Sequence, residues 1–455
     1  MRKLFGTDGI RGIAGDVLTG ELAFSVAKAA GQVLGERGGR VLIGTDTRGS
    51  AQMLETALAS GFMTMGMDVT LVGVIPTPGV AYLTRKHQYT CGVVISASHN
   101  PYEYNGIKFF SKEGYKLPDE VEEEMEAYIL GEKEVDPVED FGHYDMNPDL
   151  AKEYTHYLQS LCPHHLEGMK IALDCGNGAL SKIAPYVFTS LGANVFALNT
   201  NPDGKNINAD CGSTNPTIIQ NLVLSTGAQV GFSFDGDADR IIAVDEKGRQ
   251  VDGDHILAIC ASYLKEKNQL PGGVVATIMS NLGLRKYLES IGVDFVESQV
   301  GDRYVLEEML KNNYVLGGEQ SGHIIFTDYN TTGDGLATGL HLVEVLLETG
   351  RTLSSLSDQM VTYPQVLQNA QVADEKKRTY QENEIIMKAI EAINKKYQGN
   401  GRVVIRPSGT EPLVRVMLEG TDVVEMEEDV RVLVRVIEEQ IGGNLWNIKL
   451  LGTQA

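Results

Sequence analysis

Short apolar runs alternate with helical stretches through most of the chain, and this alternation predicts an α/β architecture. The apolar runs are rich in valine, isoleucine, leucine and phenylalanine and are bounded by turn-forming residues, as β-strands are. The stretch 21–35, which precedes the first run, is rich in alanine and predicts a helix. The predicted strands fall into three groups, which are 40–46, 67–75 and 92–98, then 169–176, 193–199 and 228–237, and then 272–280, 293–301 and 313–322.

The last part of the chain has a different pattern. Residues 402–420 read as two alternating strands around a loop, and 423–441 has apolar residues at helical spacing. We therefore predict three similar α/β domains of βαβ type with mixed sheets, and a smaller C-terminal α+β domain, around a central cleft. The predicted domains span 1–150, 151–252, 253–366 and 367–455.

The first boundary follows from a change in composition. An acidic run at 119–134 is most simply the solvated face of a helix, and 135–149 contains two prolines and reads as a linker. The length of 455 residues would by itself favour about three domains, whereas the alternation of elements favours four.

The net charge limits the partners that the protein can have. The chain has 39 basic and 61 acidic residues, which gives a formal charge of −22. Such a surface repels the phosphates of nucleic acids and anionic lipids, so neither is an expected partner. A small anionic substrate would need a locally basic site, and arginines beside the motifs described below could supply one.

The cysteines and the apolar segments indicate the compartment. The five cysteines are scattered and none forms a C-x-x-C pair, which argues against a disulfide framework and a zinc cluster. The first residues lack the apolar core of a signal peptide, and no apolar run is long enough to span a bilayer. The cytoplasm is therefore the expected location.

The most informative segment is 91–110, with the sequence CGVVISASHNPYEYNGIKFF. An apolar strand leads directly to Ser98, and Pro101 prevents the strand from continuing. Ser98 is thus expected at the carboxyl end of a strand, where open α/β sheets bind their ligands. Lys108 follows ten residues later. From the residues alone, Ser98 is a nucleophile, a phosphate carrier or a loop cap.

The segment DGDADR at 235–240 is the strongest metal signal. Asp235, Asp237 and Asp239 can converge on one hard cation such as Mg²⁺ or Ca²⁺, which prefers oxygen ligands. An EF-hand loop is the competing interpretation, because Glu246 stands at the twelfth position. It is disfavoured because Arg240 occupies the position of the turn glycine and because the flanking segments read as strands.

The segment EQSGH at 319–323 follows another predicted strand. Glu319 and Ser321 could bind the hydroxyl groups of a sugar, and His323 could transfer protons near neutral pH. The order of residues is not that of the G-x-S-x-G elbow of hydrolases. A lone histidine is more often structural, so the role of His323 depends on its context.

Two further segments contribute anion-binding chemistry. The loop RPSGTEP between the last two predicted strands offers arginine, hydroxyl and backbone N–H donors for a phosphate, although a lone S-G-T would more often be a simple hairpin turn. The opening FGTDGIRG contains Arg11 and is weak evidence when taken alone. The residues of the proposed anion loop are Arg406, Ser408, Gly409, Thr410 and Arg415.

Taken together, these motifs resemble those of the α-D-phosphohexomutases, which move a phosphate between C6 and C1 of a sugar. The resemblance runs from Phe5 to about Gly420. It implies that Ser98 carries a phosphate and that one Mg²⁺ per subunit is held by phosphorylated Ser98 and the three aspartates. It also implies that Arg11 is directed at Ser98 and that Arg240 faces the substrate. A homodimer is a further implication of the resemblance.

The remaining site residues receive their roles from the same resemblance. Lys108 and His323 are the candidates for general acid and base, Glu319 and Ser321 bind the sugar, and the RPSGTEP loop binds the phosphate that is not being transferred. Gln320 resembles the members that act on glucosamine phosphates and that feed amino-sugar nucleotide and cell-wall precursor synthesis. The implied reaction converts glucosamine 6-phosphate to glucosamine 1-phosphate through a 1,6-bisphosphate.

Three alternatives stay open. Tyr104 gives some support to a member acting on glucose or mannose phosphates, because the glucosamine type more often has Asp before the Asn-Gly-Ile-Lys stretch. A non-catalytic sugar-phosphate-binding or Ca²⁺-binding protein on the same scaffold is disfavoured, because every expected catalytic position is occupied. A serine hydrolase lacks both the elbow and the triad.

Overall fold

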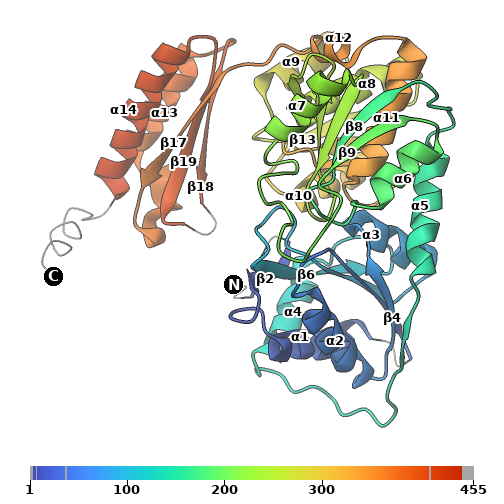
Figure 1. The fold of residues 1–455 in the computed structure, drawn as a ribbon. Helices are drawn as coiled ribbons and strands as arrows, with labels where there is room; N and C mark the ends of the chain where they lie inside the picture. Colours follow the sequence, from blue (N-terminus) through green and yellow to red (C-terminus); the bar gives the residue numbers. More distant parts are fainter. Residues whose placement is uncertain (1–3, 7, 36–37, 409–410, 443–455) are drawn as a thin grey trace, which may run out of the picture. The chain divides into compact units, whose positions relative to one another are not determined.

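The computed structural model describes residues 4–6, 8–35, 38–408 and 411–442. The chain forms two compact units, whose elements are traced in Figure 1. The larger unit contains the chain up to Thr277 together with Ile291–Gln359. The smaller unit contains Ile278–Ser290 and the chain from Met360 onward.

The first sheet of the larger unit has seven strands in the order β1-β2-β6-β5-β3-β4-β7. Its central strands β3 and β5 are buried over almost their whole length, which explains their continuous apolar sequences. The strands are β1 Phe5–Gly6, β2 Gly9–Ile13, β3 Arg40–Thr45, β4 Asp68–Val74, β5 Cys91–Ile95, β6 Tyr104–Ser111 and β7 Tyr144–Met146. The helices in this part of the chain are α1 Gly20–Leu34, α2 Ala51–Met63, α3 Thr77–Lys86 and α4 Asp119–Ile129.

Two further sheets complete the strands of the larger unit, in the orders β12-β11-β10-β8-β9 and β14-β13-β15-β16. The second sheet contains β8 Lys170–Asp174, β9 Asn194–Leu198, β10 Val230–Phe234, β11 Ile241–Asp245 and β12 Gln250–Val251. The third contains β13 Gly273–Thr277, β14 Asp294–Ser298, β15 Leu316–Gly318 and β16 Ile324–Phe326. The remaining helices of this unit are α5 Asp149–Leu161, α6 Ile183–Ser190, α7 Thr217–Thr226, α8 Gly253–Glu266, α10 Asp302–Asn312, α11 Gly335–Thr349 and α12 Leu353–Ser357.

The three sheets share one core topology. In each, three parallel strands are followed by an antiparallel fourth, in the orders β4-β3-β5-β6, β9-β8-β10-β11 and β14-β13-β15-β16. The loop from the third to the fourth strand carries a sequence motif each time, because Ser98 lies between β5 and β6, Asp235–Arg240 between β10 and β11, and Glu319–His323 between β15 and β16. The structure thus confirms the predicted repetition of one α/β architecture.

The smaller unit has a three-stranded antiparallel sheet in the order β17-β19-β18. The apolar residues of α14 pack against this sheet, and the side chain of Asp422 caps the start of the helix. Its elements are α9 Leu282–Ser290, β17 Gln365–Gln371, α13 Glu384–Lys396, β18 Arg402–Pro407, β19 Leu413–Glu419 and α14 Val423–Ile441. The sequence predicted β18, β19 and α14 but not β17, whose alternating polar residues gave no strong signal.

Two predictions for the segment after β6 were only partly right. The acidic run forms α4, but Glu122 and Glu126 on it are buried rather than solvated. Glu126 accepts hydrogen bonds from the backbone N–H groups of Leu4 and Phe5, and Glu122 pairs with Arg303. The predicted linker also contains β7, which extends the first sheet by pairing with β4.

All five cysteines lie at described positions as buried, free thiols. Within the described ranges, no helix has both the length and the apolar character that crossing a membrane requires.

Candidate active site

The Ser98 loop is held by hydrogen bonds to its carbonyl groups. The Arg48 guanidinium donates to the carbonyl oxygens of Ser98 and Asn100 at 2.9 and 2.8 Å, and to that of Pro101 at 2.5 Å. The Asn208 side chain donates to the carbonyls of Ser98 and Asn100 at 2.8 and 3.1 Å. Ser98 has a φ of +52°, a left-handed conformation that residues with a side chain seldom adopt. These donors therefore stabilise a strained backbone at the serine.

Arg48 is itself fixed by a buried carboxylate. Its Nε and its backbone N–H donate to the two oxygens of Asp46, each at 2.9 Å, and neither side chain is exposed. The hydroxyl of Ser96 donates to Asp46 Oδ2 at 2.6 Å. Burial raises the pKa of Asp46, while the charge of Arg48 acts against that rise. The support beneath the serine loop is thus a buried ion pair with its hydrogen bonds satisfied.

The Ser98 hydroxyl is directed at the aspartate loop. Its Oγ donates to Asp235 Oδ2 at 2.5 Å and lies 3.3 Å from Nδ1 of His99. The same His99 nitrogen lies 3.2 Å from Nη1 of Arg240. Burial and the charges of Arg240 and Arg11 lower the pKa of His99 to about 4, so this imidazole is neutral at pH 7.

The three aspartates of the β10–β11 loop converge as the sequence predicts for a cation site. Their ligand atoms lie within 4.8 Å of one another, and all three side chains are buried. Oδ1 of Asp237 and Oδ1 of Asp239 are buried without a hydrogen-bond partner among the described residues. Burial and the charges of the other two carboxylates raise the pKa of Asp235 well above its usual range. Unpartnered buried carboxylate oxygens at this spacing fit a hard cation such as Mg²⁺.

Lys108 lies within a network of carboxylates. Its Nζ is 2.8 Å from Asp237 Oδ2, 3.0 Å from Asp8 Oδ2 and 4.0 Å from Asp239 Oδ2. Burial acts against the ammonium form, but the charges of Asp237 and Asp8 raise the pKa of Lys108 above its ordinary value. The side chain is therefore held as a cation.

Asp8 connects three cations at the edge of this network. Besides Lys108 it pairs with Arg11 and Lys116. Burial would raise the pKa of Asp8, but the charges of Lys108, Lys116 and Arg11 hold it well below the usual range. Arg11 is thus anchored at the site by a residue three positions earlier in the same motif.

His323 is buried with both ring nitrogens near polar groups. The backbone N–H of Gly333 donates to Nε2 at 3.0 Å, and Nδ1 lies 3.5 Å from Asp239 Oδ2. Nε2 is also 3.6 Å from Asp302, which pairs with Lys116 at 2.5 Å. Because Nε2 accepts a hydrogen bond, the ring proton is carried by Nδ1 and faces Asp239.

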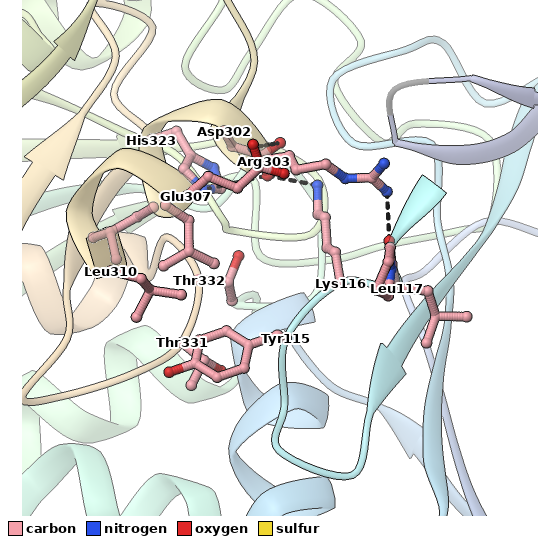
Figure 2. Close-up of a pocket in the computed structure, with 13 residues that line it drawn as sticks. Tyr115, Lys116, Leu117, Asp302, Arg303, Glu307, Leu310, His323, Thr331 and Thr332 are labelled. Atoms are coloured by element: carbon pink, nitrogen blue, oxygen red, sulfur yellow. Dashed lines mark hydrogen bonds and ion pairs between the residues drawn. The ribbon is translucent and has the colours of Figure 1, made fainter. Parts of the chain in front are cut away.

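A cavity of about 250 Å³ is lined in part by Lys116, Asp302 and His323. Figure 2 shows Lys116, Asp302 and His323 on one side of it and Thr332 with its hydroxyl directed toward them. In this view the ring of Tyr115 forms part of the lower wall of the cavity, and Leu310 lies on the left side of the cavity.

The Glu319–His323 loop is docked on the neighbouring sheet. The carbonyl of Gly322 accepts the N–H of Ile241, the first residue after the aspartate loop, at 3.0 Å. Glu319 Oε1 accepts the N–H of Gly301 at 3.2 Å, and Ser321 is exposed. The Gln320 amide donates to Asp252 Oδ2 at 3.3 Å.

In the smaller unit, the predicted anion loop joins β18 to β19. Arg406 and Arg415 are direct cross-strand partners. Arg415 also pairs with Glu411, whose carboxylate oxygen lies 3.2 Å from Nη2 of Arg415. Ser408 is buried, and its hydroxyl accepts the N–H of Glu411 at 3.2 Å. Gly409 and Thr410, which the sequence also proposed, lie outside the described residues.

The larger unit thus brings together most of the predicted residues, which are Arg11, Ser98, Lys108, Asp235, Asp237, Asp239, Arg240 and His323. Sequence reasoning missed Asp8, Arg48, Thr77 and Asp302, which contact this group, and Lys116, which pairs with Asp8 and Asp302. Only Asp8 had a signal, since it lies in the same opening motif as Arg11.

Comparison with known families identifies four consecutive matches. Models described as phosphoglucomutase/phosphomannomutase match as alpha/beta/alpha domain I at 2–136, domain II at 152–248, domain III at 252–363 and the C-terminal domain at 367–435. This confirms the predicted organisation in four domains, whereas the boundaries drawn from the sequence stay predictions.

Similar proteins cover nearly the full chain. The phosphoglucosamine mutase of Alkaliphilus metalliredigens is 54% identical over 448 residues, with 97% of this chain and 100% of that protein covered. That of Clostridioides difficile is 51% identical over 447 residues, with 97% and 100% covered. A phosphoglucomutase/phosphomannomutase family structure from Burkholderia thailandensis has a TM-score of 0.81 at 24% identity, with 95% and 97% covered, and so shows the shared fold.

Proposed function

The chain belongs to the phosphoglucomutase/phosphomannomutase family, and we propose that it interconverts glucosamine 6-phosphate and glucosamine 1-phosphate. The family is the phosphohexomutase family that the sequence motifs predicted, and its members are phosphate-transferring enzymes of the isomerase class. The substrate assignment is supported by the relatives at 50–54% identity, which are named phosphoglucosamine mutases. The observation that carries the mechanism is the Ser98 hydroxyl directed at three convergent, buried aspartates.

We propose that Ser98 is the phosphate carrier. The O1 hydroxyl of glucosamine 6-phosphate would attack the phosphorus of phosphorylated Ser98, the bond from phosphorus to Oγ would break, and a 1,6-bisphosphate would form. Return of the 6-phosphate to Oγ would restore the phosphoserine and release glucosamine 1-phosphate. The neutral His99 lies beside Oγ, Arg240 contacts the same ring nitrogen of His99, and both would orient the phosphate.

Asp235, Asp237 and Asp239 would hold Mg²⁺, which when bound neutralises charge on a phosphate at Ser98. The residues around them prepare the loop for this role. Lys108 and Thr77 donate hydrogen bonds to Asp237 Oδ2, and Ser98 donates one to Asp235 Oδ2. The orientation of these two carboxylates is therefore set by the protein. Such hydrogen bonds orient metal ligands and adjust their affinity.

Lys108 and His323 are the candidates for proton transfer. Lys108 is held as an ammonium ion beside the Ser98 site and would be the acid that protonates the departing serine oxygen, although its raised pKa opposes release of the proton. His323 is the candidate base, but its Nε2 accepts the N–H of Gly333. Proton uptake by His323 would therefore require that this bond opens. In its described position, His323 also suits a second role, which is to hold Asp239.

The smaller unit would bind the phosphate that is not transferred. Arg406 and Arg415 stand opposite each other on β18 and β19, and guanidinium groups are suited to donate hydrogen bonds to a phosphate. The loop between these strands would add backbone N–H donors.

The test is ³¹P NMR of the purified protein with Mg²⁺ and a trace of sugar 1,6-bisphosphate to phosphorylate Ser98. Glucosamine 6-phosphate, glucose 6-phosphate and mannose 6-phosphate are compared, and Ser98→Ala is the control. Rapid formation of glucosamine 1-phosphate with slow conversion of the hexoses is expected. Faster conversion of a hexose would transfer the assignment to a phosphoglucomutase or phosphomannomutase, which Tyr104 favours. No conversion of any sugar would favour a non-catalytic binding protein.

A further inference from the structure

Thr77 makes two hydrogen bonds to one residue of the aspartate loop. It is the first residue of α3 and is only 1% exposed. Its backbone N–H donates to the carbonyl of Asp237 at 2.9 Å, and its hydroxyl donates to Asp237 Oδ2 at 2.7 Å. The two residues are 160 positions apart in the sequence, so this contact joins the first sheet's helix to the loop of the second sheet.

The hydroxyl of Thr77 is not used to cap its own helix. The capping position of α3 is Pro76, and no side chain caps the start of the helix. A threonine at this point would often contribute only to helix initiation or packing. Among the described residues, the Thr77 side chain instead donates its hydrogen bond to the carboxylate of Asp237.

The contact distinguishes the two oxygens of Asp237. Oδ2 accepts hydrogen bonds from Thr77 and from Lys108, the latter at 2.8 Å. Oδ1 is buried and has no hydrogen-bond partner within the described part of the chain. Asp239 is similar only in part, since its Oδ2 faces His323 and Lys108 while its Oδ1, which has no hydrogen-bond partner there, lies 3.8 Å from Nε of Arg240. In Asp237 the protein holds one oxygen and leaves the other for a ligand.

We propose that Thr77 is a positioning residue for the metal ligand Asp237, an inference that rests on the proposed function of the aspartate loop. Its hydroxyl holds Oδ2, fixes the rotation of the carboxylate and presents Oδ1 to the cation. Without the hydroxyl, the ammonium of Lys108 alone holds Oδ2, and the carboxylate can rotate about its bond to Cβ. Cation affinity then falls because the ligand has to be ordered on binding.

The experiment compares the cation affinity of Thr77→Val with that of the unaltered protein. Valine has nearly the same shape but no hydroxyl. Loss of a residue that orients a metal ligand typically weakens metal binding by about 10–100-fold. Because Lys108 still holds Asp237 Oδ2, we expect Thr77→Val to weaken Mn²⁺ binding by about tenfold, the lower end of this range. Mn²⁺ serves as the probe, because the electron paramagnetic resonance signal of the free ion gives the dissociation constant without any turnover. Intact mass confirms that all samples carry dephosphorylated Ser98.

Thr84→Val is the matched control. Thr84 lies on the same helix and is completely buried, and its Oγ1 has no hydrogen-bond partner among the residues the structure describes. The same chemical change there should leave Mn²⁺ affinity within about twofold, since no orienting bond is lost. Thr77→Ser, which retains the hydroxyl, should bind Mn²⁺ nearly as well as the unaltered protein.

The outcomes separate the positioning role of Thr77 from the proposed metal site itself. Weak binding by Thr77→Val, with Thr77→Ser and Thr84→Val near normal, supports the positioning role. Normal binding by Thr77→Val overturns it, and so does equal weakening by Thr77→Ser or by Thr84→Val, because the cause would then be packing. Failure of the unaltered protein to bind Mn²⁺ would instead overturn the proposed metal site itself.

Discussion

Replacement of Arg48 by methionine should separate support of the serine loop from direct contact with substrate. Arg48 is buried beneath the loop and donates to the carbonyls of Ser98, Asn100 and Pro101. Methionine fills much of the same volume but donates no hydrogen bond. Two losses follow, because the loop loses its donors and the buried carboxylate of Asp46 loses its counter-charge.

The two losses have different magnitudes. Breaking a buried ion pair by removing one partner typically costs about 3–5 kcal/mol. Of the three carbonyls, those of Ser98 and Asn100 still accept hydrogen bonds from the Asn208 side chain. The loop itself therefore loses the equivalent of about one or two hydrogen bonds from a charged donor, each worth roughly 1.5–3 kcal/mol. Ser98 at φ +52° would then relax toward an ordinary conformation and carry its Oγ away from Asp235.

We therefore expect Arg48→Met to lower the free energy of unfolding by about 3–5 kcal/mol and to reduce kcat by at least about 100-fold, with a smaller change in KM. The double variant Arg48→Met with Asp46→Asn removes the uncompensated charge and should recover stability without recovering kcat. Denaturant unfolding and steady-state kinetics at a temperature where all variants are folded measure the two effects. A folded Arg48→Met protein with normal kcat would refute the reasoning, and so would parallel recovery of kcat and stability in the double variant.

Four further predictions follow from the site. Ser98→Ala should abolish turnover and leave the circular dichroism spectrum and melting temperature nearly unchanged, since the variant removes one hydroxyl; near-normal turnover would contradict the carrier role. Gly333→Ala should slow turnover at least about tenfold, because its Cβ would lie 2.7 Å from the backbone carbonyl oxygen of Asp239 and from atoms of the His323 ring, and unchanged kinetics would show that the positions of this loop and this ring are unimportant. His323→Gln can still donate toward Asp239 but cannot act as a base, so we expect a loss of about 10²–10⁴-fold in kcat if proton transfer is its role and a much smaller loss if it only holds Asp239. Arg406→Ala should raise KM with little change in kcat, and an unchanged KM would argue against a phosphate-binding loop in the smaller unit.

The sequence predicted the motif loops well because each one follows a strand with a clear apolar pattern. Ser98, the three aspartates and Glu319 all lie in loops directly after buried strands, as expected. The strands themselves end earlier than predicted, and β5 stops at Ile95, three residues before Ser98. Local patterns thus locate a site to within a few residues and identify the residue types that it offers.

The supporting residues could not be predicted in this way, because their roles depend on distant partners. Arg48 contacts a loop about fifty positions away, and Thr77 contacts Asp237 across 160 positions. Glu126 shows the same limit, since it stands in an acidic run that reads as solvated yet binds backbone N–H groups more than one hundred positions earlier. A single sequence contains no signal for such long-range pairs.

The repeated topology explains why the motifs occur where they do. In each α/β sheet the motif occupies the connection between the third parallel strand and an antiparallel neighbour, and an antiparallel pair needs no crossover helix. The connections are correspondingly short, and Asp235–Arg240 and Glu319–His323 fill theirs completely. The other loops at the same sheet edge lead into helices, and residues of these connections such as Arg48 and Thr77 hold the motif loops in place. A short hairpin-like loop at the carboxyl edge keeps its side chains available for ligands, and three copies of one sheet therefore present three different sets of chemical groups.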